Sequence, residues 1–509
     1  MNNRQAVVLI GSILLIIISL PYLVAPKLAG IGNEFGGFLI NPLDGNTYLA
    51  KMYEGYQGEW LFTLPFTANH TQGTFLFEFY IFLGHIARWL HLPLWTVFHL
   101  ARILSTILFL IALTEFLEKV IDLKGTQFAL CTALICFGSG LGWTFILFGQ
   151  VTSDFWVAEA YPFLSSFSNP HFILGMALLL AILTRTEIRG GKNLAVLWIL
   201  GISLGIIMPF AAVIAGVVAA AREGWRWFDE RKINLFPVLS ILLGAGLVVL
   251  VQYWQILQDP FLRQWNRQNV TPGVPIRDLL VSLSPVILLA AFEIFITVKD
   301  REISPCKKLL ITWVVISLAL VITPFSLQRR FIFGIYIPLA ILAVTGVDTL
   351  ALKLQKSGAS WFLFVFVLSS LTNVMIIFSG LSLVKNGNEL MVITQDEKAA
   401  FVWVAQNSST GDIVLGSPSL GNFIPGRTGR KVVYGHPFET VDAQVREEEV
   451  NSLYENFLSM EEQRQYLIDQ SIDWVIQGPR EITIGEPAIL EESLPAFQND
   501  TVTVYKVTP

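Results

Sequence analysis

The sequence predicts an α-helical polytopic membrane protein that carries a small C-terminal α/β domain. Of the 509 residues, 53% are hydrophobic and only 14% are charged, and the mean hydropathy is +0.59. A soluble globular chain carries about 25% charged residues, so the composition excludes a soluble enzyme. Residues 385–509 contain nine basic and 19 acidic residues, whereas the preceding part carries a net charge of +5. This balance excludes a basic nucleic-acid-binding protein.

Apolar stretches long enough to cross a bilayer occur eleven times, if short helices that are broken inside the protein are counted. They cover residues 5–23, 95–117, 126–148, 169–184, 193–207, 209–221, 235–257, 278–298, 308–324, 328–350 and 360–384. We expect the first stretch to be a retained span, because its end at Pro21 and Tyr22 lacks the small residues of a signal-peptide cleavage site.

Lysine and arginine in the short loops, Arg189 and Arg301 among them, predict which loops face the cytoplasm. The pattern holds if residues 193–221 form a hairpin broken at Pro209, and if residues 75–90 lie at the membrane interface. The N-terminus is then cytoplasmic and the tail extracytoplasmic, in the plasma (inner) membrane. An alternative in which residues 75–90 span the bilayer and the hairpin is one helix also gives eleven spans.

Two domains are predicted: a transmembrane module over residues 1–385, with a first outer loop at 24–93, and an extracytoplasmic α/β domain over 386–509. The tail elements that the pattern predicts are helices at 395–405 and 445–457 and strands at 412–416, 431–434, 472–476 and 501–507. Ser459 and Glu462 form a capping box that opens another helix. The glycine-rich stretch 416–429 lacks a phosphate-loop pattern, so we expect turns there.

The first outer loop contains the most informative pattern. Asp44 opens an amphipathic helix, and a Gly-acid-Trp turn followed by Pro65 ends it. Here the chain resembles the GT-C superfamily of integral-membrane glycosyltransferases, which take a sugar from a polyprenyl-phosphate carrier on the outer face, and in particular its aminoarabinose and mannosyl transferases. The residues that match the family pattern are Asp44, Tyr48, Lys51, Met52, Gly58, Glu59 and Trp60. Gly45 stands where the family has a second acid.

Transfer of a sugar to a hydroxyl requires a carboxylate that takes the hydroxyl proton, and Asp44 is the candidate. The departing phosphate requires cations, for which the candidates are Lys51, Arg102, Arg329 and Arg330. Arg102 lies inside a predicted span, where a charge is costly unless it faces a cavity or a partner. Each residue also has a structural interpretation. Asp44 can belong to a turn, and Lys51 can extend from an interfacial helix toward water. Arg329 and Arg330 can anchor a span at the headgroups, and Arg102 can hold the helix bundle together.

The resemblance implies a second acidic or histidine group from a later outer loop. The candidates are Asp154, Glu159 and His171, and Tyr48 is a candidate contact for the sugar or the acceptor. The resemblance also raises a divalent metal, Mg or Mn, which Asp44, Glu159 and His171 would hold if one is bound. His436, in the tail stretch 429–440, is interpreted as structural.

We therefore predict an inverting glycosyltransferase whose partners are a polyprenyl-phosphate sugar and membrane lipids, with Asp44 as the general base. The acceptor can be a lipid, a glycan or a protein. The alternative is a transporter or flippase of a lipid-linked or small polar substrate, which predicts internal repeats and paired broken helices. The chain has one Pro-broken hairpin and no clear repeat.

Overall fold

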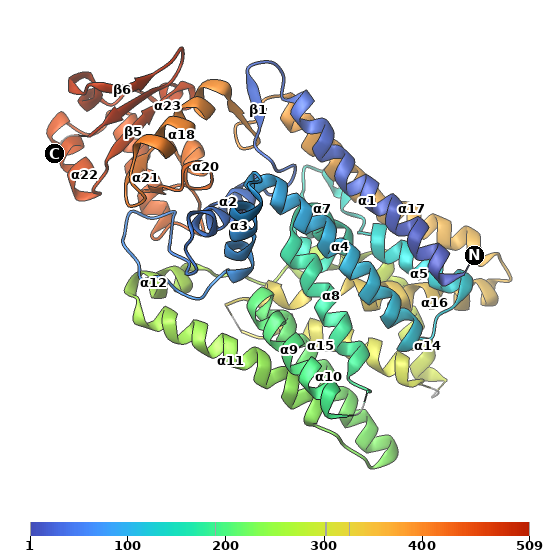
Figure 1. The fold of residues 1–509 in the computed structure, drawn as a ribbon. Helices are drawn as coiled ribbons and strands as arrows, with labels where there is room; N and C mark the ends of the chain where they lie inside the picture. The colour runs from blue at the N-terminus through green and yellow to red at the C-terminus, as the bar shows by residue number, and fades with distance from the viewer. Residues whose placement is uncertain (1, 189, 301–302, 325, 508–509) are drawn as a thin grey trace. The chain divides into compact units, whose positions relative to one another are not determined.

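A computed structural model describes residues 2–188, 190–300, 303–324 and 326–507, and the chain forms two compact units (Figure 1). The helical unit comprises Met1–Pro21, His99–Leu250 and Val270–Gly380. The mixed unit comprises Tyr22–Phe98, Val251–Asn269 and Leu381–Pro509. The chain therefore passes between the two units several times.

Nearly all of the helical unit is α-helix, and four of its helices continue into the mixed unit. The helices are α1 (Asn3–Leu28), α4 (Leu94–Lys119), α5 (Gly125–Phe137), α6 (Gly142–Ile146), α7 (Pro162–Ser168), α8 (Pro170–Arg185), α9 (Gly191–Ile207), α10 (Pro209–Glu230), α11 (Phe236–Gln258), α13 (Ile276–Leu283), α14 (Val286–Lys299), α15 (Pro305–Ile322), α16 (Tyr336–Leu354) and α17 (Gly358–Lys385), with 3₁₀ turns η1 (Ser153–Phe155), η2 (Ala158–Ala160) and η3 (Gln328–Ile332).

The described residues contain seven helices that are long and apolar enough to cross a membrane, or eight if α13 and α14, which meet at 90°, form one bent span. The protein is a multi-pass membrane protein. The predicted count of eleven is not confirmed, although each predicted stretch overlaps a helix, because α8 and α9 are shorter apolar helices. Arg189 and Arg301, which the orientation prediction uses, lie outside the described residues.

The predicted break at Pro209 is confirmed, since α9 ends at Ile207 and α10 begins at Pro209. Proline lacks the N–H that a continuous helix would need there. α10 runs to Glu230, beyond the predicted end at residue 221, because polar side chains in its last turns form hydrogen bonds and ion pairs. Arg222 donates to Thr186 Oγ1 over 2.9 Å, and Arg226 pairs with Glu223.

The mixed unit joins the first loop to the tail. Its elements are α2 (Pro42–Gln57), α3 (Glu78–Leu90), α12 (Pro260–Gln268), α18 (Gln395–Asn407), α19 (Pro418–Gly421), α20 (Ile424–Thr428), α21 (Ala443–Tyr454), α22 (Met460–Asp469), α23 (Pro479–Ile484), η4 (Ala488–Glu492), β1 (Asn33–Phe35), β2 (Val392–Thr394), β3 (Ile413–Leu415), β4 (Lys431–Val432), β5 (Trp474–Gln477), β6 (Pro495–Gln498) and β7 (Thr503–Lys506).

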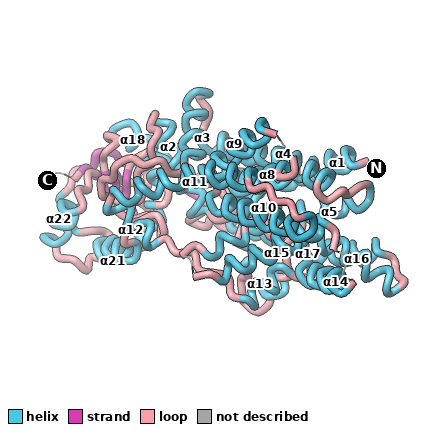
Figure 2. The backbone as a smooth tube through the Cα atoms, turned by 90° about the horizontal axis from the view of Figure 1, so that it is seen from below, coloured by secondary structure: helices cyan, strands magenta, loops and turns pink. Residues whose placement is uncertain are grey.

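The tail is a small α/β fold, as predicted, and its strands are the magenta segments near the C-terminus in Figure 2. Its sheet has the order β4-β3-β5-β7-β6, in which β4, β3 and β5 are parallel and β7 is antiparallel to both of its neighbours. The capping box that opens α22 is confirmed, because both of its hydrogen bonds are present. Two short helices, α19 and α20, occupy the stretch in which turns were predicted.

The first loop packs against the tail, so the predicted division at residue 385 separates segments that belong to one compact unit. Strand β1 pairs with β2 in antiparallel register. α2 packs closely on α3, because a Cβ on Gly55 would lie 2.0 Å from Ile81 O and one on Gly84 would lie 1.9 Å from Met52 O. α3 has 13 residues and is not among the candidate spans.

Candidate functional site

Three predicted site residues lie on one face of α2. Asp44, Tyr48 and Lys51 are spaced four and three residues apart, which stacks them along a helix. α2 begins at Pro42, a residue suited to the first helical turn, and Asp44 lies in that turn, where the helix dipole favours a negative charge. Gly58, at a φ of 109°, ends the helix in the left-handed conformation.

Lys51 is held in a buried ion pair. Its side chain is 1% exposed, and Nζ donates to Glu439 Oε1 over 2.6 Å. Nζ also lies 3.8 Å from the centre of the Phe77 ring, where the ring face attracts a cation. Because Glu439 belongs to the tail and Lys51 to the first loop, this pair joins two segments that are 388 residues apart.

Asp44 faces a histidine of the tail. His436 Nε2 lies 3.4 Å from Asp44 Oδ1, and the two side chains are 3% and 49% exposed. Asp44 is therefore open enough to meet a substrate, whereas its histidine neighbour is buried. Tyr48 stacks on Tyr80 with ring centres 4.4 Å apart, which places an aromatic surface on the same face of α2.

One turn beyond Lys51, α2 carries a buried carboxyl group. Glu54 Oε1 accepts hydrogen bonds from Thr63 N and Thr63 Oγ1. Burial raises the pKa of Glu54 to about 8, while the Thr63 hydrogen bonds and the charges of Lys431 and Lys51 act in the opposite direction. Desolvation dominates, because removing a carboxylate from water penalises the charged form.

In the helical unit, two predicted arginines converge on one predicted acid. Arg329 Nε and Arg330 Nη1 each lie 3.3 Å from Glu159 Oε1. The Arg329 guanidinium also lies 4.7 Å from the centre of the Trp156 ring. Two guanidinium groups and one carboxylate give the cluster one excess positive charge. The carboxylate is 4% exposed, whereas the arginines are 20% and 29% exposed, so solvent reaches guanidinium donors.

His171 precedes Phe172, and their ring centres are 4.0 Å apart; the Phe172 ring centre lies 5.8 Å from the Arg330 guanidinium. Asp154 is enclosed instead. It accepts from Thr152 Oγ1 (2.6 Å), Thr372 Oγ1 (2.9 Å) and the Gly142 amide (3.0 Å). The Gly142 amide is the first of α6, so one of these bonds ties Asp154 to the start of that helix. Burial raises the pKa of Asp154, while the hydrogen bonds act in the opposite direction.

Arg102 is 1% exposed on α4. Its Nη1 donates to Ser166 O over 2.8 Å and its Nε to His99 Nδ1 over 3.3 Å. The bond to Ser166 ties α4 to α7, which agrees with the structural interpretation of this arginine. Its role toward phosphate stays a prediction.

The metal prediction also stays open. Among the described residues, no group of three or more His, Cys, Asp or Glu side chains is close enough to hold a metal ion. Asp44 belongs to the mixed unit, whereas Glu159 and His171 belong to the helical unit. A metal held by all three therefore remains a prediction.

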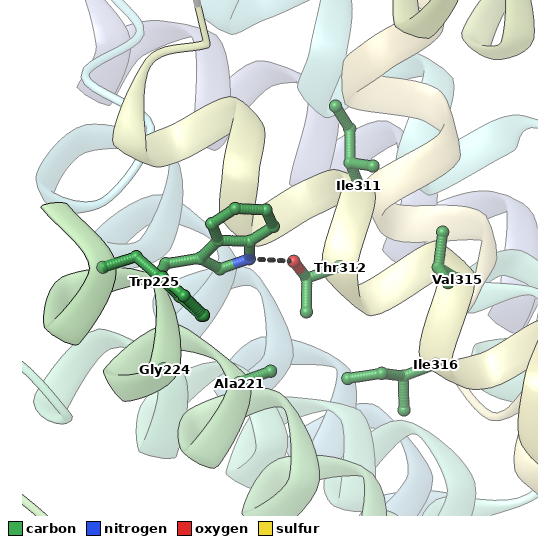
Figure 3. Close-up of a pocket in the computed structure, with 8 residues that line it drawn as sticks. Ala221, Gly224, Trp225, Ile311, Thr312, Val315 and Ile316 are labelled. Atoms are coloured by element: carbon green, nitrogen blue, oxygen red, sulfur yellow. Dashed lines mark hydrogen bonds between the residues drawn. The ribbon is translucent and has the colours of Figure 1, made fainter. Parts of the chain in front are cut away.

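A cavity of about 400 Å³ lies between α10 and α15 of the helical unit (Figure 3). Trp225 Nε1 donates to Thr312 Oγ1 across it over 3.0 Å. The described residues that line this cavity carry no titratable group, and none of them is a predicted site residue. The cavity therefore offers neither a base nor a cation for sugar transfer.

Solved structures have the same fold. The arabinofuranosyltransferase AftD from Mycobacteria matches with a TM-score of 0.53 at 12% identity, over 99% of this chain and 40% of its own. The archaeal oligosaccharyltransferase AglB from Archaeoglobus fulgidus, in complex with an inhibitory peptide and a dolichol-phosphate, matches with a TM-score of 0.50 at 12% identity, over 94% of this chain and 70% of its own.

The chain has the GT-C fold. The predicted fold class and the resemblance to the GT-C superfamily are thereby confirmed at the level of fold. ArnT from Cupriavidus metallidurans, bound to undecaprenyl phosphate, matches with a TM-score of 0.49 at 12% identity, over 98% of this chain and 97% of its own. No protein-family profile and no curated protein matches the sequence.

Two residues of the mixed unit were not predicted as site residues. Glu439 was not a candidate, and His436 was interpreted as structural, yet they contact Lys51 and Asp44. The usable signal was the stretch Gly435-His436-Pro437-Phe438-Glu439, which places two titratable side chains in one tight turn. Nothing in that stretch identifies α2 as its partner.

Glu54 predicts a pH effect on stability. The unfolded chain loses this proton near pH 4.5, whereas the folded protein keeps it until about pH 8. The stabilisation from the protonated group is therefore complete below about pH 4.5 and is lost as the pH rises toward 8. Thermal unfolding in lipid nanodiscs should show the wild type losing stability relative to Glu54→Gln between pH 5 and pH 8. The exposed Glu455→Gln variant is the control. If the difference in stability between wild type and Glu54→Gln stays constant from pH 5 to pH 8, the raised pKa of Glu54 is contradicted.

Glu439→Ala should destabilise the protein by about 3 kcal/mol, because it leaves the Lys51 ammonium buried without a counter-charge. The double variant Lys51→Met/Glu439→Leu should recover most of this loss, since a buried pair can be replaced by apolar groups. Thermal unfolding measures both, with exposed Glu448→Ala as the control. Unchanged stability in Glu439→Ala would contradict the buried pair.

Proposed function

We propose that this protein is a membrane glycosyltransferase that moves a sugar from a polyprenyl-phosphate donor to an acceptor hydroxyl on the outer face of the membrane, with inversion at the anomeric carbon. The observation that carries the proposal is Asp44: a half-exposed carboxylate in the first turn of α2, within a chain that has the GT-C fold. The dolichol-phosphate in the AglB complex supports a lipid phosphate as the donor class.

In the proposed step, Asp44 accepts the proton of the acceptor hydroxyl. The hydroxyl oxygen bonds to the anomeric carbon from the face opposite the phosphate, and the bond between that carbon and the phosphate oxygen breaks. The phosphate leaves with the electron pair. A general base placed in this way contributes about 10²- to 10⁴-fold to the rate.

Arg329 and Arg330 are the proposed ligands of the donor phosphate. Two guanidinium groups share the single Glu159 carboxylate, which cannot accept from all of their N–H donors. A phosphate would take the remaining donors and balance the excess charge, and arginine suits phosphate geometry. Lys51 is engaged by Glu439, so the proposal for the phosphate rests on the arginine pair.

The topology that goes with this function has a cytoplasmic N-terminus and an extracytoplasmic tail in the inner membrane. The short loops supply the charge argument, since basic residues concentrate on one side of the predicted spans. This orientation places the first loop, and with it Asp44, on the outer side.

Asp44→Asn should lower sugar transfer by about 10²-fold or more. The assay follows release of radiolabelled sugar from polyprenyl-phosphate donors by purified protein in lipid nanodiscs, with and without Mg or Mn. Asp122→Asn, which removes an exposed carboxylate, is the control. A wild type that releases sugar from no donor contradicts the proposed function, and carrier translocation in its place would indicate a transporter. Full turnover in Asp44→Asn contradicts the assignment of the base.

Arg330→Ala should raise the KM for the donor by about tenfold, which corresponds to about 1.4 kcal/mol, because it removes the excess positive charge of the cluster. Arg330→Lys should be intermediate, since it restores the charge but not the planar fork. Steady-state kinetics on the same donors measures the change, with Lys356→Ala as the control. If Arg330→Ala lowers thermal stability but leaves the donor KM unchanged, the arginine is structural.

A further inference from the structure

The turn at residues 435–440 satisfies its own backbone with two side chains. Thr440 Oγ1 accepts from the amides of Gly435 and His436 over 3.4 and 3.3 Å. His436 Nδ1 accepts from the amides of Phe438 and Glu439 over 3.1 Å each. The imidazole is therefore locked to the turn from which it projects.

These bonds determine which ring nitrogen carries the proton. A neutral imidazole has one N–H donor and one acceptor nitrogen. Because Nδ1 of His436 accepts from two amides, the proton lies on Nε2, and Nε2 is the atom that lies 3.4 Å from Asp44 Oδ1. The Phe66 ring, with its centre 6.2 Å from that of the imidazole, helps to bury the histidine.

A second contact aligns the turn with α2. Asn422 Nδ2 donates to Gly435 O (3.0 Å) and to Leu43 O (3.3 Å), and Asn422 Oδ1 accepts from Asn46 Nδ2 (2.7 Å). The same amide thus holds the residue before His436 and the residue before Asp44. The Lys51–Glu439 pair anchors the other end of this contact, so the turn and the helix meet in one register.

We infer that His436 is a positioning residue for Asp44. The Nε2–H group faces Asp44 Oδ1 and so holds the carboxylate in the orientation in which it meets the acceptor hydroxyl. When the carboxylate takes the acceptor proton, His436 keeps its own, because the two turn amides occupy Nδ1. The inference rests on the proposed function, since it assigns to the tail a role in orienting the base of that reaction.

Two variants separate this role from a purely structural one. In His436→Gln the amide N–H can reach the position of Nε2–H, but no acceptor remains at the position of Nδ1. In His436→Asn the side-chain oxygen can replace Nδ1 and accept from the turn amides, as asparagine does in Asx turns, but no donor reaches Asp44. Each variant therefore keeps one of the two contacts and removes the other.

If His436 positions Asp44, the more stable of the two variants should be the less active one. His436→Asn should keep the higher Tm of the two but lose kcat by about 10- to 100-fold, the usual effect of removing an orienting partner, with the donor KM unchanged. His436→Gln should have the lower Tm and the higher kcat. His91→Asn, at an exposed left-handed position that suits asparagine, is the matched control.

Sugar-release kinetics and thermal unfolding on the same nanodisc samples decide the question. If kcat follows Tm across the two variants, or if His436→Asn turns over like the wild type while Asp44→Asn is inactive, the positioning role is overturned and the proposed function stands. If the wild type releases sugar from no donor, the proposed function fails and the inference fails with it.

Discussion

The ion pair between Lys51 and Glu439 is the constraint on which the mixed unit depends. Lys51 is almost completely buried, and an ammonium group is tolerated there only with a counter-charge. The carboxylate that provides it belongs to the tail, so α2 cannot separate from the turn at residues 435–440 without leaving a charge unpaired. The same packing brings His436 to Asp44. A requirement of folding thus determines the surroundings of the proposed base.

Much of the fold could be predicted because its determinants are local. The apolar stretches, the break at Pro209 and the capping box at Ser459 each depend on residues within a few positions of one another. The count of eleven spans is not confirmed, because hydropathy does not distinguish a spanning helix from shorter apolar helices such as α8. The pairing of β1 with β2 depends on residues more than 350 positions apart, and no local pattern indicates it.

In the candidate site too, features that depend on neighbouring residues were predicted, and contacts between distant residues were not. The spacing of Asp44, Tyr48 and Lys51 predicts a shared helix face, and the structure has one. Glu159 and the arginines were predicted as separate candidates, and the fold brings them into one cluster. Their convergence depends on the packing of η3 near Glu159, about 170 positions earlier in the chain, which the hydrophobic periodicity of the sequence does not predict. Asp154 was predicted as a candidate second acid from its loop position, and this stays a prediction; its three hydrogen bonds depend on the fold and could not be predicted.

In the arrangement that we infer, the turn at residues 435–440 brings the Nε2–H group of His436 to Asp44. Solid-state NMR of protein labelled with ¹⁵N-histidine in lipid bilayers tests it most directly, because protonated and unprotonated ring nitrogens differ widely in chemical shift, and His436→Asn identifies the signals. We expect a protonated Nε2 and an unprotonated Nδ1, with the Nε2 signal displaced in Asp44→Asn. A protonated Nδ1, or an Nε2 signal that has the same chemical shift in Asp44→Asn as in the wild type, would contradict the contact between His436 and Asp44 on which the positioning role depends.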